Sequence, residues 1–209
     1  MRLIERIAEA DVIAEFLRAE IDSPRFGPRV RARIEADGRD ESVVRMADTT
    51  DADDNAYREA LLHSYRGVGC SAPLLEGLPA RIDWHRAEIA RDALDEVHYI
   101  DYPYWNELSA GTRLPRVAAG RIHAGVRAMD RPNDGFIALA ARLCAGEALG
   151  MPILIAPDRA SPAVILEGHT RVTAMLLRPD CLPDPVPFLV GFAPAVRGWR
   201  FYGTPERTE

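Results

Sequence analysis

The stretch Val164-Ile-Leu-Glu167-Gly168-His169-Thr170-Arg171-Val-Thr-Ala174 joins an apolar run to a glycine and then to a helix-like pattern. The apolar run from Ala163 to Leu166 predicts a short buried strand, and the residues from Thr170 to Leu177 predict an amphipathic helix. Gly168 permits a sharp turn between them, because a residue without a Cβ adopts backbone angles that other residues avoid. The stretch therefore predicts a strand, a tight turn and a helix in direct succession.

Two further apolar runs flank this stretch. Pro152 to Ala156 precedes it across the turn-forming residues Asp158 to Pro162, and Val186 to Val190 follows it. Short apolar runs bounded by proline and turn residues are typical of strands. We therefore expect an α+β protein, in which a helical N-terminal region, residues 1–130, packs on a small mixed β-sheet within residues 131–209 as one compact unit.

The helical region is predicted from apolar residues that recur at helical spacing. Helices are expected over residues 4–17, 28–35, 83–97, 115–129 and 134–149. A further helix is expected after the acidic run from Asp48 to Asp54. Carboxylates at such a position satisfy the first amides of a helix, so we interpret this run as a helix cap rather than a metal site.

The charge of the chain excludes several classes of protein. All 26 positive residues are arginine, and the formal net charge is −6 over 209 residues. Without lysine the chain has no Schiff-base residue for pyridoxal phosphate, no P-loop lysine and no kinase strand lysine. The negative charge argues against binding of duplex DNA and makes a nuclease a minor hypothesis.

The apolar stretches and the cysteines indicate in which cellular compartment the protein is expected. No apolar stretch approaches the roughly 20 residues that cross a bilayer, and the first residues lack the pattern of a signal peptide. We therefore expect no membrane association and a cytoplasmic location. Cys70, Cys144 and Cys181 are far apart and odd in number, so no disulfide is expected.

The turn at Gly168 carries the residue types of an anion site. Backbone amides that follow a glycine turn at a helix start attract phosphate. Thr170 adds a hydroxyl, Arg171 offers a bidentate contact, and Glu167 and His169 can exchange protons. The alternative is that His169 and Arg171 merely cap and pair within an ordinary α+β domain.

These residues resemble a known family. A strand, a D/E-G-x-x-R turn and a helix, followed by another strand, is similar to the core shared by the ParB N-terminal domain, sulfiredoxin and the free-serine kinases. The resemblance covers about residues 151–192, and the kinases' D-G-H-H-R turn corresponds to Glu167-Gly168-His169-Thr170-Arg171. The whole chain is also similar to uncharacterised bacterial proteins that join a helical region to this core.

The resemblance implies carboxylate chemistry at Glu167 and phosphate binding by Gly168, His169, Thr170 and Arg171. Sulfiredoxin carries its reactive cysteine in the corresponding turn, whereas none of the three cysteines lies there in this chain. ParB proteins bind CTP and continue into a helix-turn-helix DNA domain, whereas this acidic chain ends soon after the third expected strand. Both of these activities are therefore disfavoured relative to a kinase-like one.

An aromatic segment from His98 to Arg113 is the second concentration of functional residue types. Its rings suit stacking on a base, and we interpret Asp101 and Arg113 as the ligand-facing side and Trp105 as core. The alternative is that these aromatic residues join two layers of the fold, with their polar tips hydrogen-bonded.

Together these features predict a nucleotide- or phosphate-binding protein, with a small-molecule phosphotransferase as the specific hypothesis. Glu167 or His169 would be the catalytic base, and Mg²⁺ with a nucleoside di- or triphosphate would be the cofactor, since no lysine neutralises phosphate charge. The partner would be a small-molecule nucleotide. A regulatory or protein-interaction module that keeps the fold without catalysis is the alternative.

Overall fold

The structure is a computed structural model, and it describes residues 1–70 and 73–203. The chain forms two compact units: a helical unit, residues 7–78, and a sheet unit, residues 1–6 together with 79–209. The sheet unit thus contains the region 131–209 expected from the sequence, of which residues 204–209 lie outside the described part. It also takes in residues 1–6 and 79–130, which the sequence assigned to the helical region.

The helical unit contains α1 (Glu9–Glu20), α2 (Gly27–Ala36), α3 (Ser42–Arg45) and α4 (Ala52–Arg66). Asp51 caps α4 by accepting a hydrogen bond from the Asp54 amide at 2.9 Å, which confirms the cap expected from the acidic run. The apolar faces of the helices are buried. Their buried residues include Val12, Phe16, Leu17, Val30, Ile34, Val44, Leu61 and Leu62.

Arg58 is an unusual member of this interior, because its side chain is fully buried. Its Nη1 donates to the carbonyl oxygen of Val43 at 2.9 Å, and its Nη2 donates to that of Asp48 at 2.7 Å. A buried cation is tolerated when it is hydrogen-bonded, as both terminal nitrogen atoms of Arg58 are. Arg58 therefore fixes the segment between α3 and α4 from inside the helical unit.

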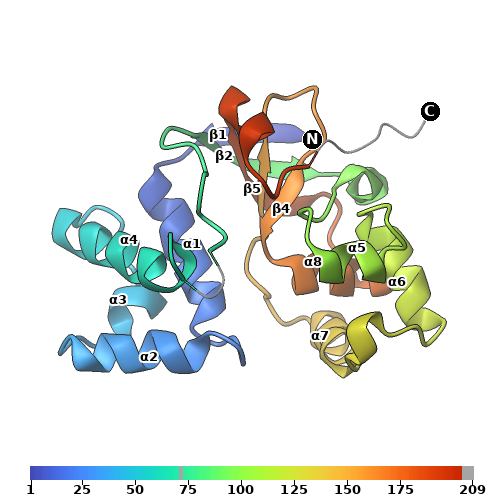
Figure 1. Ribbon diagram of the computed structural model, residues 1–209, viewed down its shortest axis with the longest axis horizontal. Coiled ribbons are helices and arrows are strands. Elements are labelled where there is room, and N and C mark those ends of the chain that lie inside the picture. The colour runs from blue at the N-terminus through green and yellow to red at the C-terminus, as the bar shows by residue number, and fades with distance from the viewer. Residues whose placement is uncertain (71–72, 204–209) are drawn as a thin grey trace. The chain divides into compact units, whose positions relative to one another are not determined.

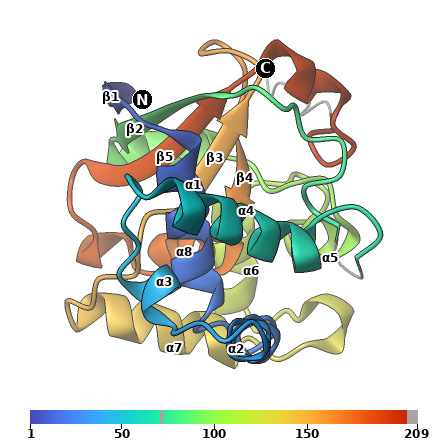
Figure 2. The same ribbon diagram turned by 90° about the vertical axis from the view of Figure 1, so that its left-hand side faces the viewer.

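The sheet unit is built on one mixed sheet. Within the described residues its strands are β1 (Arg2–Arg6), β2 (Asp83–Ile89), β3 (Ile153–Ala156), β4 (Val164–Glu167) and β5 (Val186–Phe192). They lie side by side in the order β1-β2-β5-β3-β4 (Figure 2). The β3–β5 pair is parallel and the other pairs are antiparallel. Strands β3, β4 and β5 confirm the three strands expected from the sequence.

One expected helix is wrong and another, α1, begins later than expected, because strand pairing prevails over local helix preference. Residues 83–97 form β2 and a short 3-10 turn, Arg91–Glu96, instead of a helix, and Ile4 lies in β1. β2 pairs along its whole length with β5, from Asp83 opposite Phe192 to Ile89 opposite Val186. Such pairing supplies backbone partners that an isolated segment lacks, so it decides the conformation of residues with weak local preferences.

Helices cover one face of this sheet (Figure 1). They are α5 (Pro103–Leu108), α6 (Pro115–His123), α7 (Asp134–Cys144) and α8 (His169–Leu177). α6 and α7 begin where expected but end earlier than the predicted ends at residues 129 and 149. Short 3-10 turns lie at Ala128–Asp130, Pro179–Cys181 and Pro194–Gly198.

The core of the sheet unit lies between the helices and the covered face of the sheet. Alternate strand residues such as Leu154, Ile165 and Val190 belong to the same buried cluster as Phe136 of α7 and Val172 of α8. Over the residues that the structure describes, no helix is long and apolar enough to cross a membrane.

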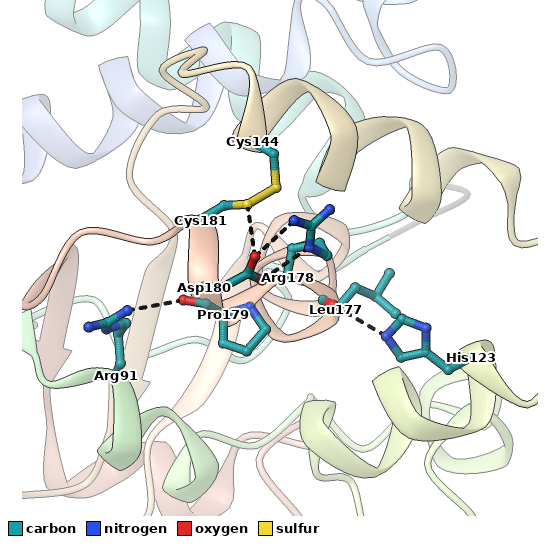
Figure 3. The surroundings of a disulfide bond; sticks show 8 residues. All are labelled: Arg91, His123, Cys144, Leu177, Arg178, Pro179, Asp180 and Cys181. Carbon is teal, nitrogen blue, oxygen red and sulfur yellow. Dashed lines mark hydrogen bonds and ion pairs between the residues drawn. A yellow bond between two sulfur atoms is a disulfide. The ribbon is translucent and has the colours of Figure 1, made fainter.

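The expectation that no disulfide forms is wrong. Cys144, the last residue of α7, is bonded to Cys181, with their Cα atoms 5.0 Å apart, while Cys70 remains a free thiol. The two half-cystines lie 37 positions apart in sequence. They meet because α7 packs against α8 and the turn after α8 carries Cys181 to the end of α7 (Figure 3). Sequence spacing does not reveal such a meeting.

Candidate functional site

The predicted strand, turn and helix are present. β4 ends at Glu167, Gly168 adopts the left-handed conformation with φ +92°, and α8 begins at His169. This backbone angle favours glycine, because a Cβ would clash with the following carbonyl oxygen. Gly168 holds the N-cap position of α8 and has no side chain with which to cap it. The first amides of α8 therefore have no side-chain cap from the N-cap residue.

Gly168 is also enclosed by its neighbours. A Cβ at this position would lie 3.0 Å from Cβ of Pro152 and 3.1 Å from Nη2 of Arg171. These contacts are tighter than ordinary van der Waals contact. The absence of a side chain at residue 168 is thus required twice, by the backbone angle and by the close approach of Pro152 and Arg171.

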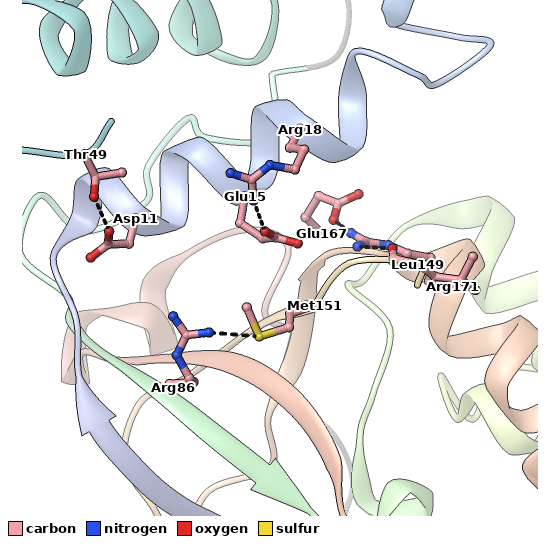
Figure 4. Close-up of polar contacts among 9 residues, drawn as sticks. All are labelled: Asp11, Glu15, Arg18, Thr49, Arg86, Leu149, Met151, Glu167 and Arg171. Atoms are coloured by element: carbon pink, nitrogen blue, oxygen red, sulfur yellow. Dashed lines mark hydrogen bonds and ion pairs between the residues drawn. The ribbon is translucent and has the colours of Figure 1, made fainter. Parts of the chain in front are cut away.

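The guanidinium of Arg171 folds back across the turn. It forms an ion pair with the carboxylate of Glu167, and its Nη1 donates to the carbonyl oxygen of Leu149 at 3.0 Å (Figure 4). The side chains of Arg171 and Glu167 are only 9% and 14% exposed. Both groups that the sequence singled out for chemistry are therefore engaged with each other, which matches the alternative that Arg171 pairs inside the domain.

Thr170 differs from its neighbours, because it is exposed at the first turn of α8. The amide groups of residues 169–171 belong to the first helical turn, where amides have no partner inside the helix. The positive end of the helix dipole adds to this local charge. The exposed side of the turn therefore presents a hydroxyl and a positive helix end.

His169 joins the turn to the aromatic segment. Its ring stacks on Trp105 with centroids 5.0 Å apart, and Trp105 stacks on Tyr99 at 4.6 Å. Tyr104 and Phe136 meet the Trp105 ring edge-on. These contacts place Trp105 against the core, as expected, and they favour the interpretation that the aromatic residues join layers of the fold.

A buried hydroxyl pair lies directly beneath this stack. The hydroxyl groups of Tyr99 and Thr173 are 2.5 Å apart, and Thr173 also donates to the carbonyl oxygen of His169 at 2.7 Å. Burial raises the pKa of Tyr99, so its hydroxyl stays protonated. The first turn of α8 is thus fixed from the inside by a neutral hydrogen-bond network.

Asp101 and Arg113 lie together, and their bonds go to neighbouring residues and to the segment at Phe201 and Tyr202. Arg113 is buried and donates through Nη2 to the carbonyl oxygens of Tyr99 at 2.7 Å and Tyr202 at 2.5 Å. The Asp101 amide donates to Phe201 at 2.7 Å, and burial lowers the pKa of Arg113. The two residues hold the chain end to the sheet unit, so the structure gives them a supporting role.

Metal ligands do not gather in the described part of the chain. Among residues 1–70 and 73–203, no group of three or more His, Cys, Asp and Glu side chains is arranged to hold a metal ion. Glu167 is the carboxylate at the turn, and its partner is Arg171. A magnesium ion at this turn would therefore depend mainly on oxygen atoms of the ligand.

The structure brings together Glu167, Gly168, His169, Thr170 and Arg171, as the sequence predicted. Sequence reasoning missed the carbonyl group of Leu149, which no residue type signals because it is a backbone atom. It also missed Thr173, although its position four residues after His169 is the spacing at which a helical hydroxyl bonds a preceding carbonyl. No family model, curated protein or solved structure matches this chain.

Proposed function

We propose that this protein binds a small phosphate-bearing ligand, with nucleotides as the favoured class, at the turn from Gly168 to Arg171. The observation that carries the proposal is the start of α8. A left-handed glycine without a side chain precedes first-turn amides, the exposed Thr170 hydroxyl and an adjacent guanidinium. Helix starts of this kind bind phosphate because their amides and dipole favour negative charge.

The resemblance of the turn to the ParB, sulfiredoxin and free-serine kinase core supports the same ligand class. The proposal therefore includes that fold type for the sheet unit and a cytoplasmic location. Fold-level resemblance alone does not assign chemistry, so the ligand class rests on the turn itself.

Arg171 has two states in this proposal. Without ligand its guanidinium binds Glu167 and the carbonyl oxygen of Leu149. A bound phosphate competes with Glu167 for the guanidinium, because Arg binds phosphate and carboxylate with the same planar fork. Mg²⁺ would accompany a di- or triphosphate through the phosphate oxygens. Release of Glu167 from Arg171 would then free the carboxylate to accept a proton from a hydroxyl acceptor in a phosphotransferase.

A second candidate, a non-catalytic regulatory or interaction module, is favoured by one observation. The Glu167–Arg171 pair is almost completely withdrawn from solvent. If the pair is permanent, neither residue reaches a ligand and the turn serves only to build the fold. The two candidates therefore differ in whether this pair opens.

Binding is tested by thermal unfolding and titration calorimetry with inorganic phosphate, ATP, ADP, CTP and GTP, each with and without magnesium. A ligand at 100 times its dissociation constant stabilises the folded state by about 2.7 kcal/mol. Thr170→Glu places a carboxylate at the anion position and should abolish the shift. Ala138→Glu, an equal change of charge at an exposed position of α7, is the matched control and should bind normally.

Catalysis is tested by incubating the wild type with the binding nucleotide and a panel of small hydroxyl acceptors. Turnover that is lost in Glu167→Gln, with nucleotide affinity kept within a few fold, supports the phosphotransferase. Binding without turnover supports the non-catalytic module, and no stabilisation by any of the anions refutes the phosphate site.

A further inference from the structure

The disulfide closes a covalent loop around the strand, turn and helix described above. The segment between Cys144 and Cys181, which lie 37 positions apart, contains β3, β4, Gly168 and α8. Leu149, whose carbonyl group holds Arg171, follows Cys144 by five residues. The bond therefore joins the start and the end of the segment that builds the turn.

The two halves of the disulfide are held differently. Cys181 lies in the 3-10 turn after α8, and other parts of the sheet unit anchor this region (Figure 3). Arg91 Nη1 donates to the carbonyl oxygen of Pro179 at 3.4 Å, and Nε2 of His123 lies 3.2 Å from the carbonyl oxygen of Leu177. The Cys181 side thus keeps non-covalent anchors when the disulfide is broken.

Beyond Cys144, residues 145–147 are hydrogen-bonded to the end of their own helix. The amides of Ala145, Gly146 and Glu147 donate back to α7, to the carbonyl oxygens of Ala141, Leu143 and Arg142 at 3.0–3.1 Å. The side chain of Glu147 also pairs with Arg142. Terminal turns of this kind open locally when a tertiary link is removed.

The two sulfur atoms also differ in access. Cys144 is exposed, whereas Cys181 is half-buried with Oδ2 of Asp180 3.7 Å from its Sγ. The more exposed Cys144 is therefore the expected point of attack for an incoming thiolate, whereas Asp180, paired with Arg178, lies against the sulfur of Cys181. The rate of thiol–disulfide exchange depends on which sulfur atom is attacked and on how accessible that atom is.

We propose that Cys144–Cys181 is a reversible redox modification site, exchanged by low-molecular-weight thiols or dithiol oxidoreductases, and that its oxidation state controls the order of residues 145–147. This site does not depend on phosphate binding at the turn. The proposal does rest on the cytoplasmic location proposed above, because disulfides in reducing compartments are usually of this transient type.

The exchange proceeds in two balanced steps. A thiolate attacks Sγ of Cys144, the S–S bond breaks, and Cys181 leaves as a thiolate that takes a proton from water. A second thiolate attacks the external sulfur of the mixed disulfide, which releases Cys144 as a thiolate that is also protonated. In total, two external thiols are oxidised to one disulfide and the two cysteines are reduced by two electrons.

The first test uses the Cys70→Ser protein, in which only Cys144 and Cys181 remain. The folded protein is incubated with reduced glutathione, quenched with an alkylating reagent and mapped by mass spectrometry. We expect a mixed disulfide on Cys144, double alkylation at higher thiol, and restoration of the bond by oxidised glutathione. Reduction only after denaturation, or a mixed disulfide on Cys181, overturns the proposal.

The second test measures amide hydrogen exchange in the oxidised and reduced forms of the same protein. We expect several-fold faster exchange at residues 145–147 after reduction, at labelling times too short for residues 172–177 of α8 to exchange in either form. Cys144→Ser should reproduce the reduced pattern, and reduced wild type provides the same measurement if that variant folds poorly. Unchanged exchange at residues 145–147, or exchange of residues 172–177 at the same short labelling times, contradicts a local redox effect.

Discussion

The carboxylate of Glu167 and the guanidinium of Arg171 form an ion pair across Gly168, with the glycine turn enclosed between them. Glu167 ends a strand and Arg171 lies in the first turn of a helix, so the pair connects two elements that run in different directions. The pair therefore fixes the angle at which the helix leaves the sheet. It also sets the condition for ligand binding at this turn, because an anion must compete with Glu167.

The first prediction concerns this pair. Arg171→Met leaves Glu167 with a nearly buried, unpaired charge, and removal of one partner of a buried pair costs about 3–5 kcal/mol. The double variant Glu167→Gln with Arg171→Met leaves no such charge, so it should lose clearly less stability than the sum of the two single variants. Urea unfolding of the four proteins measures the coupling. Additive losses would show that the pair contributes nothing as a pair.

The second prediction concerns the backbone at the turn. Gly168→Ala combines an unfavourable backbone angle with a Cβ placed 3.0 Å from Pro152. Gly146→Ala is the matched control, because Gly146 has φ +82° and no heavy atom within 4 Å of a Cβ. The angle alone costs about 1–2 kcal/mol. Urea unfolding should show a larger loss of the free energy of unfolding for Gly168→Ala than for Gly146→Ala. Equal losses would mean that Pro152 moves aside at no cost in stability.

The third prediction concerns the stability that the disulfide provides. Closure of a loop of 37 positions in the unfolded chain should stabilise the fold by about 2–4 kcal/mol. The Cys144→Ser, Cys181→Ser double variant should therefore unfold at a clearly lower urea concentration than the oxidised wild type. Cys70→Ser should change the free energy of unfolding by no more than about 0.5 kcal/mol. A double variant as stable as the oxidised wild type would contradict the prediction.

The fourth prediction concerns pH. Burial lowers the pKa of His98 below its ordinary value of about 6.5, and the charge of Arg113 acts in the same direction. The unfolded chain therefore binds this proton more readily than the folded chain. The contribution of neutral His98 is complete above pH 6.5 and is lost as the pH falls through the unfolded pKa towards the lower folded one.

His98→Gln removes this proton while keeping a donor for the carbonyl oxygen of Glu96, which the His98 ring contacts at 3.0 Å. The free energy of unfolding should fall less between pH 7 and pH 5 in this variant than in the wild type. Chemical unfolding at a series of pH values makes the comparison. Identical pH slopes would show that His98 is not the group responsible.

The part of the fold that the sequence predicts well is the part with strong local patterns. The apolar runs ending at Ala156 and Leu166 form strands, and Gly168 separates strand from helix, because their local sequence favours these conformations without distant partners. Residues 83–89 were predicted wrongly because their strand depends on β5, which lies nearly 100 positions further along the chain. The disulfide was missed for the same reason, since a packing contact creates it.

The sequence predicted which residues form the candidate site, but not which other groups they contact. The five residues of the turn were identified from their types, and the structure places them together. The groups that contact them were not identified. Leu149 binds Arg171 through its backbone carbonyl group, and Trp105 contacts His169 through the face of its ring. The roles of Asp101 and Arg113 also depend on the position of Tyr202, a contact across about 90 residues.

The pairing of β1 with β2 has a consequence for how this chain is built. Residues 7–78 lie in sequence between these two adjacent strands, so the helical unit is an insertion into what would otherwise be a hairpin. During synthesis β1 is made first, and it cannot pair with β2 until the whole insertion has been synthesised. Joining Arg6 to Asp83 through a short turn would let β1 and β2 pair sooner. It would also lower the conformational entropy lost when the loop between the two strands closes. The shortened chain would then keep the five-stranded sheet of the described residues without the helical unit.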